Sequence, residues 1–214
     1  ISDQVLYFKS QGQETDSISF MGMGEPLSNP ENVFEAINIL TNPELMGISP
    51  RRINVSTVGI VPQIKILTEK YPQVNLAFSL HSPFPEERLN LMPITKSYPI
   101  DAVFAALDAH IKKTKRRVFL AYILLAGIND DTEHAKALVE LIKKRGEHGY
   151  LYHVNLIRYH SGPTDTEFKE TTTEKIDSFR KILDEKKISN SLRQSFGLKI
   201  FAACGQLYGG YKKK

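Results

Sequence analysis

Five apolar runs rich in β-branched residues recur along this chain, and a helix signal accompanies each of them. The runs lie at residues 17–21, 53–56, 74–80, 118–124 and 150–159. Nearly continuous apolar runs suit strands that are buried on both faces, as in a parallel sheet. Strands that alternate with helices favour right-handed crossovers between parallel neighbours. The sequence therefore predicts an α/β fold with five parallel strands.

The predicted helices have recognisable ends, and each has one apolar face. Asn29 and Pro30 fit an N-cap and a first helical residue. A later helix ends in a basic turn followed by Gly146, which is typical of a helix stop. A helical stretch at 5–8 comes before the first predicted strand, and there is no initiator methionine, so we interpret the chain as part of a longer protein.

Composition places the chain among soluble globular proteins. It has 214 residues, 41% of them hydrophobic, which fits a single domain over 1–214 whose last segment, 189–214, is less regular. We find no apolar run of the roughly 18 residues that a membrane span needs. With one cysteine and no apolar leader, we expect a cytoplasmic protein. The excess of 28 Lys and Arg over 24 Asp and Glu permits a polyanionic partner but does not require one.

Polar residues follow the predicted strands at corresponding places, and in parallel α/β folds ligands bind at the carboxyl ends of strands. Glycines such as Gly24 let a ligand approach the backbone, and the Glu25 carboxylate suits an ammonium group. Hydrogen bonds to a hydroxylated or carboxylated ligand are available from Ser79, His81 and Asn155. Two structural alternatives stay open: the glycines relieve a tight turn, and Ser56 with Thr57 forms a turn at a helix entry.

The remaining candidates are histidines and a lone thiol. We expect His153 to be a hydrogen-bonded core residue and His134 to be solvated. The six histidines and one cysteine show no metal-ligand spacing. Cys204 lies among small residues and is either inert packing or a reactive group.

Six strings, in order along the chain, resemble the radical SAM methyltransferases of the RlmN and Cfr type. That family modifies an adenosine of 23S ribosomal RNA. The resemblance implies an incomplete (β/α)6 barrel, similar to a TIM barrel, with five parallel strands present and the first strand missing. The strings are Phe20-Met-Gly-Met-Gly-Glu-Pro26, Ser56-Thr-Val-Gly59, Ser79-Leu-His81, Leu91-Met-Pro-Ile94, His153-Val-Asn-Leu-Ile157 and Ala202-Ala-Cys-Gly-Gln-Leu207.

The resemblance also implies roles for individual residues. Gly24 and Glu25 would bind the methionine amino end of S-adenosylmethionine. Cys204 would be the methyl carrier, itself methylated during turnover. The rest of the cofactor site would be lined by Ser56, Ser79, Leu80, His81 and Asn155.

The family mechanism explains why a thiol is needed, because the adenine C2 and C8 carbons are poor nucleophiles. A first S-adenosylmethionine methylates Cys204, and a second is cleaved at a [4Fe-4S] cluster to a radical that activates the S-methyl group. Members carry the cluster on a three-cysteine loop upstream of the helix at 5–8, which this chain does not contain. The resemblance implies an external electron donor for the cluster. We expect the parent protein to be a monomer and this chain alone to be inactive.

Several alternatives remain open at this stage. The stretches at 49–52, 79–83 and 151–159 resemble Cfr, which methylates C8 and confers antibiotic resistance, whereas Pro26 matches the RlmN form, which methylates C2. A truncated protein that only binds RNA is a second reading, and a small-molecule aldolase or hydrolase a third. The RNA-binding reading would use the lysine-rich carboxyl-terminal tail and Arg51, Arg52, Lys112, Lys113, Lys115, Arg116 and Arg117.

Overall fold

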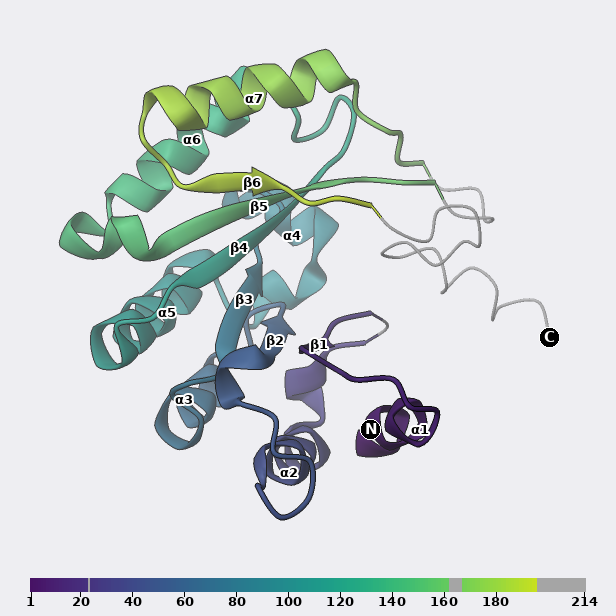
Figure 1. Cartoon of the computed structure of the whole chain (residues 1–214). Helices are drawn as coiled ribbons and strands as arrows, with labels where there is room; N and C mark the ends of the chain where they lie inside the picture. Colours follow the sequence, from purple (N-terminus) through teal and green to yellow (C-terminus); the bar gives the residue numbers. More distant parts are fainter. Residues whose placement is uncertain (23, 162–166, 196–214) are drawn as a thin grey trace.

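The chain folds around one curved sheet of parallel strands, seen in a computed structural model that describes residues 1–22, 24–161 and 167–195. The six strands lie side by side in the order in which they occur in the chain (Figure 1). This sequential order is that of an open barrel, so the predicted parallel α/β fold is confirmed. The strands are β1 (Ile18–Phe20), β2 (Ile53–Thr57), β3 (Asn75–Ser79), β4 (Val118–Leu124), β5 (Tyr152–Arg158) and β6 (Asn190–Leu192).

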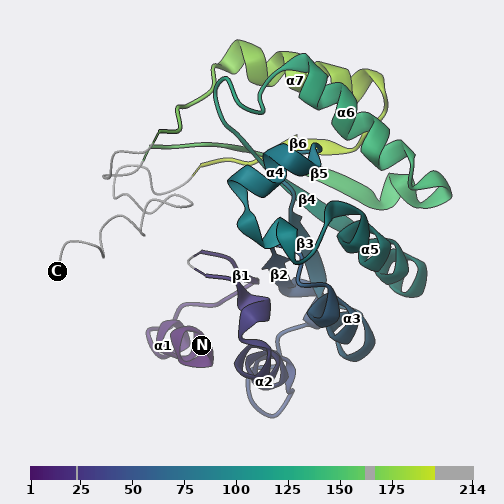
Figure 2. The ribbon, with the colours of Figure 1, turned by 180° about the vertical axis from the view of Figure 1, so that it is seen from behind.

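Helices cover the outer face of the sheet and leave its two edges, β1 and β6, apart, as the opposite views in Figures 1 and 2 show. They are α1 (Ser2–Ser10), α2 (Pro30–Thr41), α3 (Val61–Lys70), α4 (Pro85–Leu91), α5 (Ile100–Thr114), α6 (Thr132–Lys143) and α7 (Thr173–Glu185). Short 3-10 turns are η1 (Pro26–Ser28), η2 (Pro50–Arg52), η3 (Pro93–Lys96) and η4 (Gly146–Leu151). No helix in the described part of the chain is long and apolar enough to cross a membrane.

The core lies between the sheet and its outer helices. Along β4 every second residue is fully buried, namely Val118, Leu120, Tyr122 and Leu124, and the residues between them are only half-buried. The same alternation occurs in β2 and β5. The expectation that these strands are buried on both faces is therefore wrong for the inner face. That face lines the open interior of the barrel, where small and polar residues such as Asn54 and Ser56 replace large apolar ones.

A sixth strand lies where the sequence predicts an irregular segment. β6 pairs in parallel with β5 through three residue pairs, from Val154 with Asn190 to Leu156 with Leu192. Its three residues, Asn-Ser-Leu, are mostly polar and too few to show a hydrophobic pattern. Pairing with β5, rather than local propensity, makes this segment a strand.

His134 is buried, with 7% of its surface exposed, and not solvated as the sequence analysis expects. Its Nδ1 lies 2.8 Å from Asp131 Oδ1 and its Nε2 lies 3.0 Å from Glu87 Oε2. The ring also packs edge-on against Phe84, with centroids 5.0 Å apart. The polar helix neighbours that suggested solvent exposure are close in sequence, whereas the residues that bury His134 come from α4 and the segment before it.

Candidate active site

Six of the seven predicted ligand-binding residues line one cavity at the carboxyl ends of the strands. The cavity has a volume of about 160 Å³. It continues toward the barrel interior as a second cavity of about 240 Å³, which shares Met21, Ala77, Asn155 and Arg193 with the first. The predicted residues brought together are Gly24, Glu25, Ser56, Ser79, His81 and Asn155.

Glu25 ties the loop after β1 to the end of β2. Its Oε1 accepts a hydrogen bond from the Leu27 backbone N–H (3.0 Å), and its Oε2 accepts one from the Val58 N–H (2.8 Å). A carboxylate offers about four lone-pair positions, so each oxygen keeps acceptor capacity for a cationic ligand group. Gly24 precedes it with a φ of 89°, a conformation that side chains rarely adopt. The sharp turn therefore places the Glu25 carboxylate at the rim of the cavity.

The last two residues of β2, Ser56 and Thr57, have different roles. Thr57 is buried, and its hydroxyl accepts a hydrogen bond from the Gly59 N–H (3.1 Å), which is the structural role that the sequence analysis left open. Ser56 instead faces the cavity from the inner side of the sheet. Its hydroxyl is thus available to a ligand.

His81 faces the cavity from the loop after β3, as a neutral ring. Its Nδ1 accepts a hydrogen bond from the Ile123 backbone N–H (3.1 Å), so the ring proton resides on Nε2. Burial, together with the smaller effect of the nearby Arg88 charge, lowers the pKa of His81 to about 4. At neutral pH the ring therefore presents an N–H donor and no charge.

Side chains of β5 and β6 form a short polar network next to the cavity. Ser191 donates to Asn155 Oδ1 (2.9 Å), and its hydroxyl also lies 2.9 Å from His153 Nε2. Ser189 lies 2.8 Å from the other ring nitrogen of His153. As expected from the sequence, both ring nitrogens of His153 have hydrogen-bond partners, but the residue is half-buried on the inner face of the sheet and is not part of the core. The network holds Asn155 against the cavity wall.

One predicted residue, Leu80, does not line the cavity, and a second, Cys204, cannot be placed relative to it because it is not among the described residues. The Leu80 side chain is fully buried in the core. Its N–H donates to the Ala121 carbonyl (3.0 Å) and its carbonyl accepts from Arg88 Nε (3.1 Å), so its backbone groups are also occupied. Cys204 lies outside the described residues. Sequence reasoning missed Arg193, a cation that lines both cavities, because it follows a strand with no hydrophobic signal.

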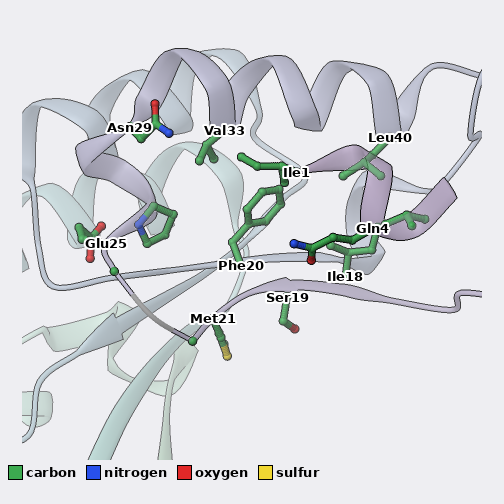
Figure 3. A pocket seen from close by; sticks show the side chains of 14 residues that line it. Ile1, Gln4, Ile18, Ser19, Phe20, Met21, Glu25, Asn29, Val33 and Leu40 are labelled. Atoms are coloured by element: carbon green, nitrogen blue, oxygen red, sulfur yellow. The ribbon is translucent and has the colours of Figure 1, made fainter. Parts of the chain in front are cut away.

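A larger cavity of about 320 Å³ lies beside the first, between α1, β1 and α2. In Figure 3 the apolar side chains of Ile18 and Phe20 point toward α2, where they approach Val33 and Leu40, whereas Ser19 and Met21 point to the opposite side. Gly24 and Glu25 line both this cavity and the one at the strand ends. The loop after β1 is thus the wall that the two cavities share.

The described residues offer no metal site, and the basic residues of the RNA-binding reading that precede β2 and β4 lie away from the cavity. No group of three or more His, Cys, Asp or Glu in the described ranges could hold a metal ion. An iron–sulfur cluster needs several cysteine thiolates, and the chain has one cysteine, Cys204. The described residues therefore do not fit a cluster. Arg51, Arg116 and Arg117 directly precede β2 and β4, at the end of the sheet opposite the cavity.

Comparisons with known proteins place the chain near one group of enzymes. It is 53% identical over 213 residues to the ribosomal RNA large subunit methyltransferase Cfr of Staphylococcus aureus, covering 99% of this chain and 61% of that protein. It is 50% identical over 214 residues to the Cfr of Bacillus velezensis, covering 100% of this chain and again 61% of the relative. The chain thus spans about three fifths of the length of these curated relatives. No protein-family model matches.

Solved structures agree with the sequence comparison. A radical SAM methyltransferase from Sphaerobacter thermophilus superposes with a TM-score of 0.87 at 38% identity, over 95% of this chain and 58% of that one. A domain of pyruvate-formate lyase-activating enzyme from Bacteroides vulgatus has a TM-score of 0.62 at 17% identity, over 84% of this chain and 100% of that one, which shows a shared fold alone. Over nearly its whole length the chain is thus similar in sequence to the Cfr ribosomal RNA methyltransferases, and in sequence and fold to a radical SAM methyltransferase.

Proposed function

We propose that this chain supplies the S-adenosylmethionine site of an enzyme that methylates an adenosine of 23S ribosomal RNA. The observation that carries the proposal is the convergence of six residues, from β2, β3, β5 and the loops after β1 and β3, on one cavity at the carboxyl ends of the sheet. Such a position is where parallel α/β folds bind ligands. The Cfr relatives are named ribosomal RNA large subunit methyltransferases, and they match nearly all of this chain, which supports the proposed reaction and substrate.

The cavity residues match the chemical groups of S-adenosylmethionine. Glu25 would accept the ammonium group with the lone pairs that its backbone bonds leave free. His81 would donate its Nε2–H to an oxygen acceptor, and the hydroxyls of Ser56 and Ser79 would either donate or accept. Ala77 and Ala121 line the same cavity with small side chains, which leaves room for the ligand.

The finer features of the reaction are also part of the proposal. When bound, S-adenosylmethionine supplies the methyl group, and a cluster held by residues outside this chain supplies radical chemistry with electrons from an external donor. Cys204 would carry the methyl group. We further propose adenosine C8 as the target, with resistance to ribosomal antibiotics as its consequence, in a monomeric cytoplasmic protein. The matching stretches at 79–83 and 151–159 support C8 over C2.

Binding tests the cofactor site directly. In the full-length protein, Glu25→Gln removes the negative charge and keeps a carbonyl acceptor for one backbone N–H. Because charge-assisted bonds are about twice as strong as neutral ones, we expect S-adenosylmethionine affinity, measured by calorimetry, to fall about tenfold. The matched control is Glu69→Gln, which loses an outer ion pair with Lys113 and should leave the affinity unchanged. Equal affinities in both variants would remove Glu25 from the site.

RNA analysis tests the reaction. Mass spectrometry of 23S ribosomal RNA from cells that express the full-length protein should find a new methyl group on one adenosine, at C8. The Cys204→Ala variant should leave the RNA unmodified while it binds S-adenosylmethionine with unchanged affinity, because only the methyl carrier is lost. A methyl group at C2 would replace the C8 assignment. Methylation that persists in the alanine variant would refute the carrier role.

A further inference from the structure

The backbone of His81 adopts a conformation that is unfavourable for a histidine. Its φ is 58°, in the left-handed region that non-glycine residues avoid. Such conformations persist where the surroundings enforce them, and they concentrate at functional sites. The conformation turns the ring toward the cavity and places Nδ1 within hydrogen-bond distance of the Ile123 N–H. The residues that hold the backbone there are therefore of interest.

Asn129 holds His81 from one side. Its side chain is completely buried, and its Nδ2 donates to the carbonyls of His81 (2.7 Å) and Ile123 (2.8 Å). Its Oδ1 accepts from the Leu125 N–H (2.7 Å), and its own carbonyl accepts from the Tyr122 hydroxyl (2.9 Å). One amide thus joins the His81 loop to the end of β4. It does not line the cavity.

Arg88 supports the same loop through hydrogen bonds to the backbone carbonyls just before His81. Its guanidinium is completely buried, makes no ion pair in the described part of the chain, and lies over the Phe78 ring, 4.9 Å from the centroid. Its Nη2 donates to the carbonyls of Ser79 (3.0 Å) and Val58 (2.7 Å), and its Nε donates to Leu80. A buried charge is costly unless it is fully hydrogen-bonded. Here Nη1 donates to Thr95 of η3 (2.6 Å), and the other three hydrogen bonds go to the ends of β2 and β3, the two strands that carry Ser56 and Ser79.

We propose that Asn129 and Arg88 are positioning residues that hold His81 in its left-handed conformation, as a neutral Nε2–H donor for an oxygen acceptor of the bound ligand. His81 Nε2 makes no hydrogen bond within the described ranges, so its proton is free for that acceptor. The identity of the ligand as S-adenosylmethionine rests on the proposed function. The positioning of the ring does not, so the two can be tested separately.

The substitution Asn129→Asp tests the inference with almost no change of shape. The new carboxyl group would face two carbonyl oxygens, so burial and repulsion raise its pKa. At pH 8 the carboxylate repels the His81 carbonyl, whereas at pH 5.5 the protonated form donates to it. In the full-length protein, we expect calorimetric affinity for S-adenosylhomocysteine to fall about tenfold at pH 8 and to recover partly at pH 5.5. The wild-type affinity should change much less.

Other titratable and charged groups near this position are present in both proteins. The groups on the loop of residue 129 and on α6 are Asp130, Asp131 and His134. The groups on α4 are Glu87 and Arg88. On α7, Lys175 binds Asp130 (2.9 Å). Tyr122 and His81 face Asn129 directly. Because these groups titrate in the wild type as well, the difference between the two pH profiles reports position 129.

Nitrogen NMR of the histidine rings gives a readout that needs no ligand. Between pH 5.5 and 8, the wild-type His81 ring should show the shifts of the neutral form protonated at Nε2. In Asn129→Asp at pH 8 the ring should lose this single-tautomer signature. His110 is the internal control, because its ring is buried and its pKa is also lowered to about 4 by burial, but it bonds Thr68 (2.9 Å) in the outer helix layer. Its signals should be the same in both proteins.

The outcomes separate the two claims. If the wild type does not bind S-adenosylhomocysteine, the proposed function fails, and the His81 shifts still decide the positioning role. Wild-type affinity and unchanged His81 shifts in Asn129→Asp at pH 8 would overturn the inference.

Arg88→Lys keeps the inference testable if Asn129→Asp does not fold, since lysine cannot reproduce the forked bonds to two strand ends. It should weaken binding about tenfold. Its matched control is Arg145→Lys. Arg145 also lies over a ring, that of Phe104 (5.3 Å), but it directly precedes η4, bonds Asp108 of α5 and does not line the cavity. Equal affinities in the two lysine variants would overturn the role of Arg88.

Discussion

Gly59 occupies a position where any side chain would be strained and would clash. Its φ is 109°, and an added Cβ would lie 2.8 Å from Val103 Cγ2 and 3.0 Å from Phe78 Cε2. Real Cβ atoms do not approach so closely, so α5 or β3 would have to shift. The glycine of the Ser-Thr-Val-Gly string therefore serves close packing between the strand ends and α5, while Ser56 of the same string faces the cavity.

Gly59→Ala should accordingly lower the free energy of unfolding by about 2–4 kcal/mol, since overpacking adds to backbone strain. The matched control is Gly127→Ala, where φ is 72° but no heavy atom lies within 4 Å of the added Cβ. That variant should lose only about 1 kcal/mol. Urea denaturation measures both values. Equal losses would show that packing against Val103 is unimportant.

The sequence predicts cavity residues better than the residues that support them. Glu25, Ser56 and His81 lie at or just after the carboxyl ends of strands, and the rule that strand ends meet at one edge of a parallel sheet is enough to bring them together. Arg88 and Asn129 have no such signal. A charged residue on a short helix and an asparagine in a loop are usually exposed, and only the tertiary contacts of the two side chains explain their burial. For Leu80, the resemblance implied a role that its buried side chain does not support directly.

Among the elements, α4 and α6 are joined by His134. The ring lies between Asp131, the N-cap of α6, and Glu87 of α4. Burial alone lowers the pKa of His134, but the hydrogen bonds and negative charges of Asp131 and Glu87 outweigh it, so that the pKa lies above its ordinary value of 6.5. The protonated ring therefore binds both carboxylates more strongly than the neutral ring does.

A raised pKa fixes the sign of the pH dependence. The extra stability from His134 is fully present below pH 6.5 and is lost as the pH rises through the higher pKa of the folded state. Wild-type stability should thus exceed that of His134→Gln by more at pH 6 than at pH 8.5. Urea midpoints at the two pH values measure this difference. A difference that is the same at both would contradict the ion-pair role.

Most elements follow their sequence pattern, but β6 does not. Asn29 and Pro30 begin α2 as predicted, and the apolar face of α6 is buried as its spacing indicates. The three-residue strand β6 escapes prediction, because it owes its conformation to pairing with β5. The inner face of the sheet is also missed. Hydrophobic runs report burial against the helices, but a polar residue within them, such as Ser56 or Asn155, marks the face that lines the cavity.

At the scale of the whole molecule, α1 differs from the rest. It contains no buried residue, and Leu6, Tyr7 and Phe8 are each about half exposed. β4, in contrast, pairs with a neighbour on each side, and four of its residues are fully buried. Regions with few buried contacts open at little free-energy cost. The stability of the fold is therefore concentrated in the central strands.

Hydrogen exchange should resolve this gradient in the chain 1–214. Amides of α1 should exchange orders of magnitude faster than those of β4, because opening α1 costs about 0–1 kcal/mol, whereas opening β4 requires global unfolding. Peptide-level mass spectrometry compares the two segments in one sample. Protection of α1 equal to that of β4 would show that the helix is held by contacts other than those described.

The agreement between strand order and chain order affects how the cavity can be assembled during synthesis. Each strand pairs with the one made immediately before it, so a growing chain can extend the sheet one unit at a time as it leaves the ribosome. The cavity cannot be completed in the same gradual way. Asn155 and Arg193, which line the same cavity as Glu25, emerge more than a hundred residues after it. Folding is progressive, whereas competence to bind a ligand arrives only after the last strand has paired.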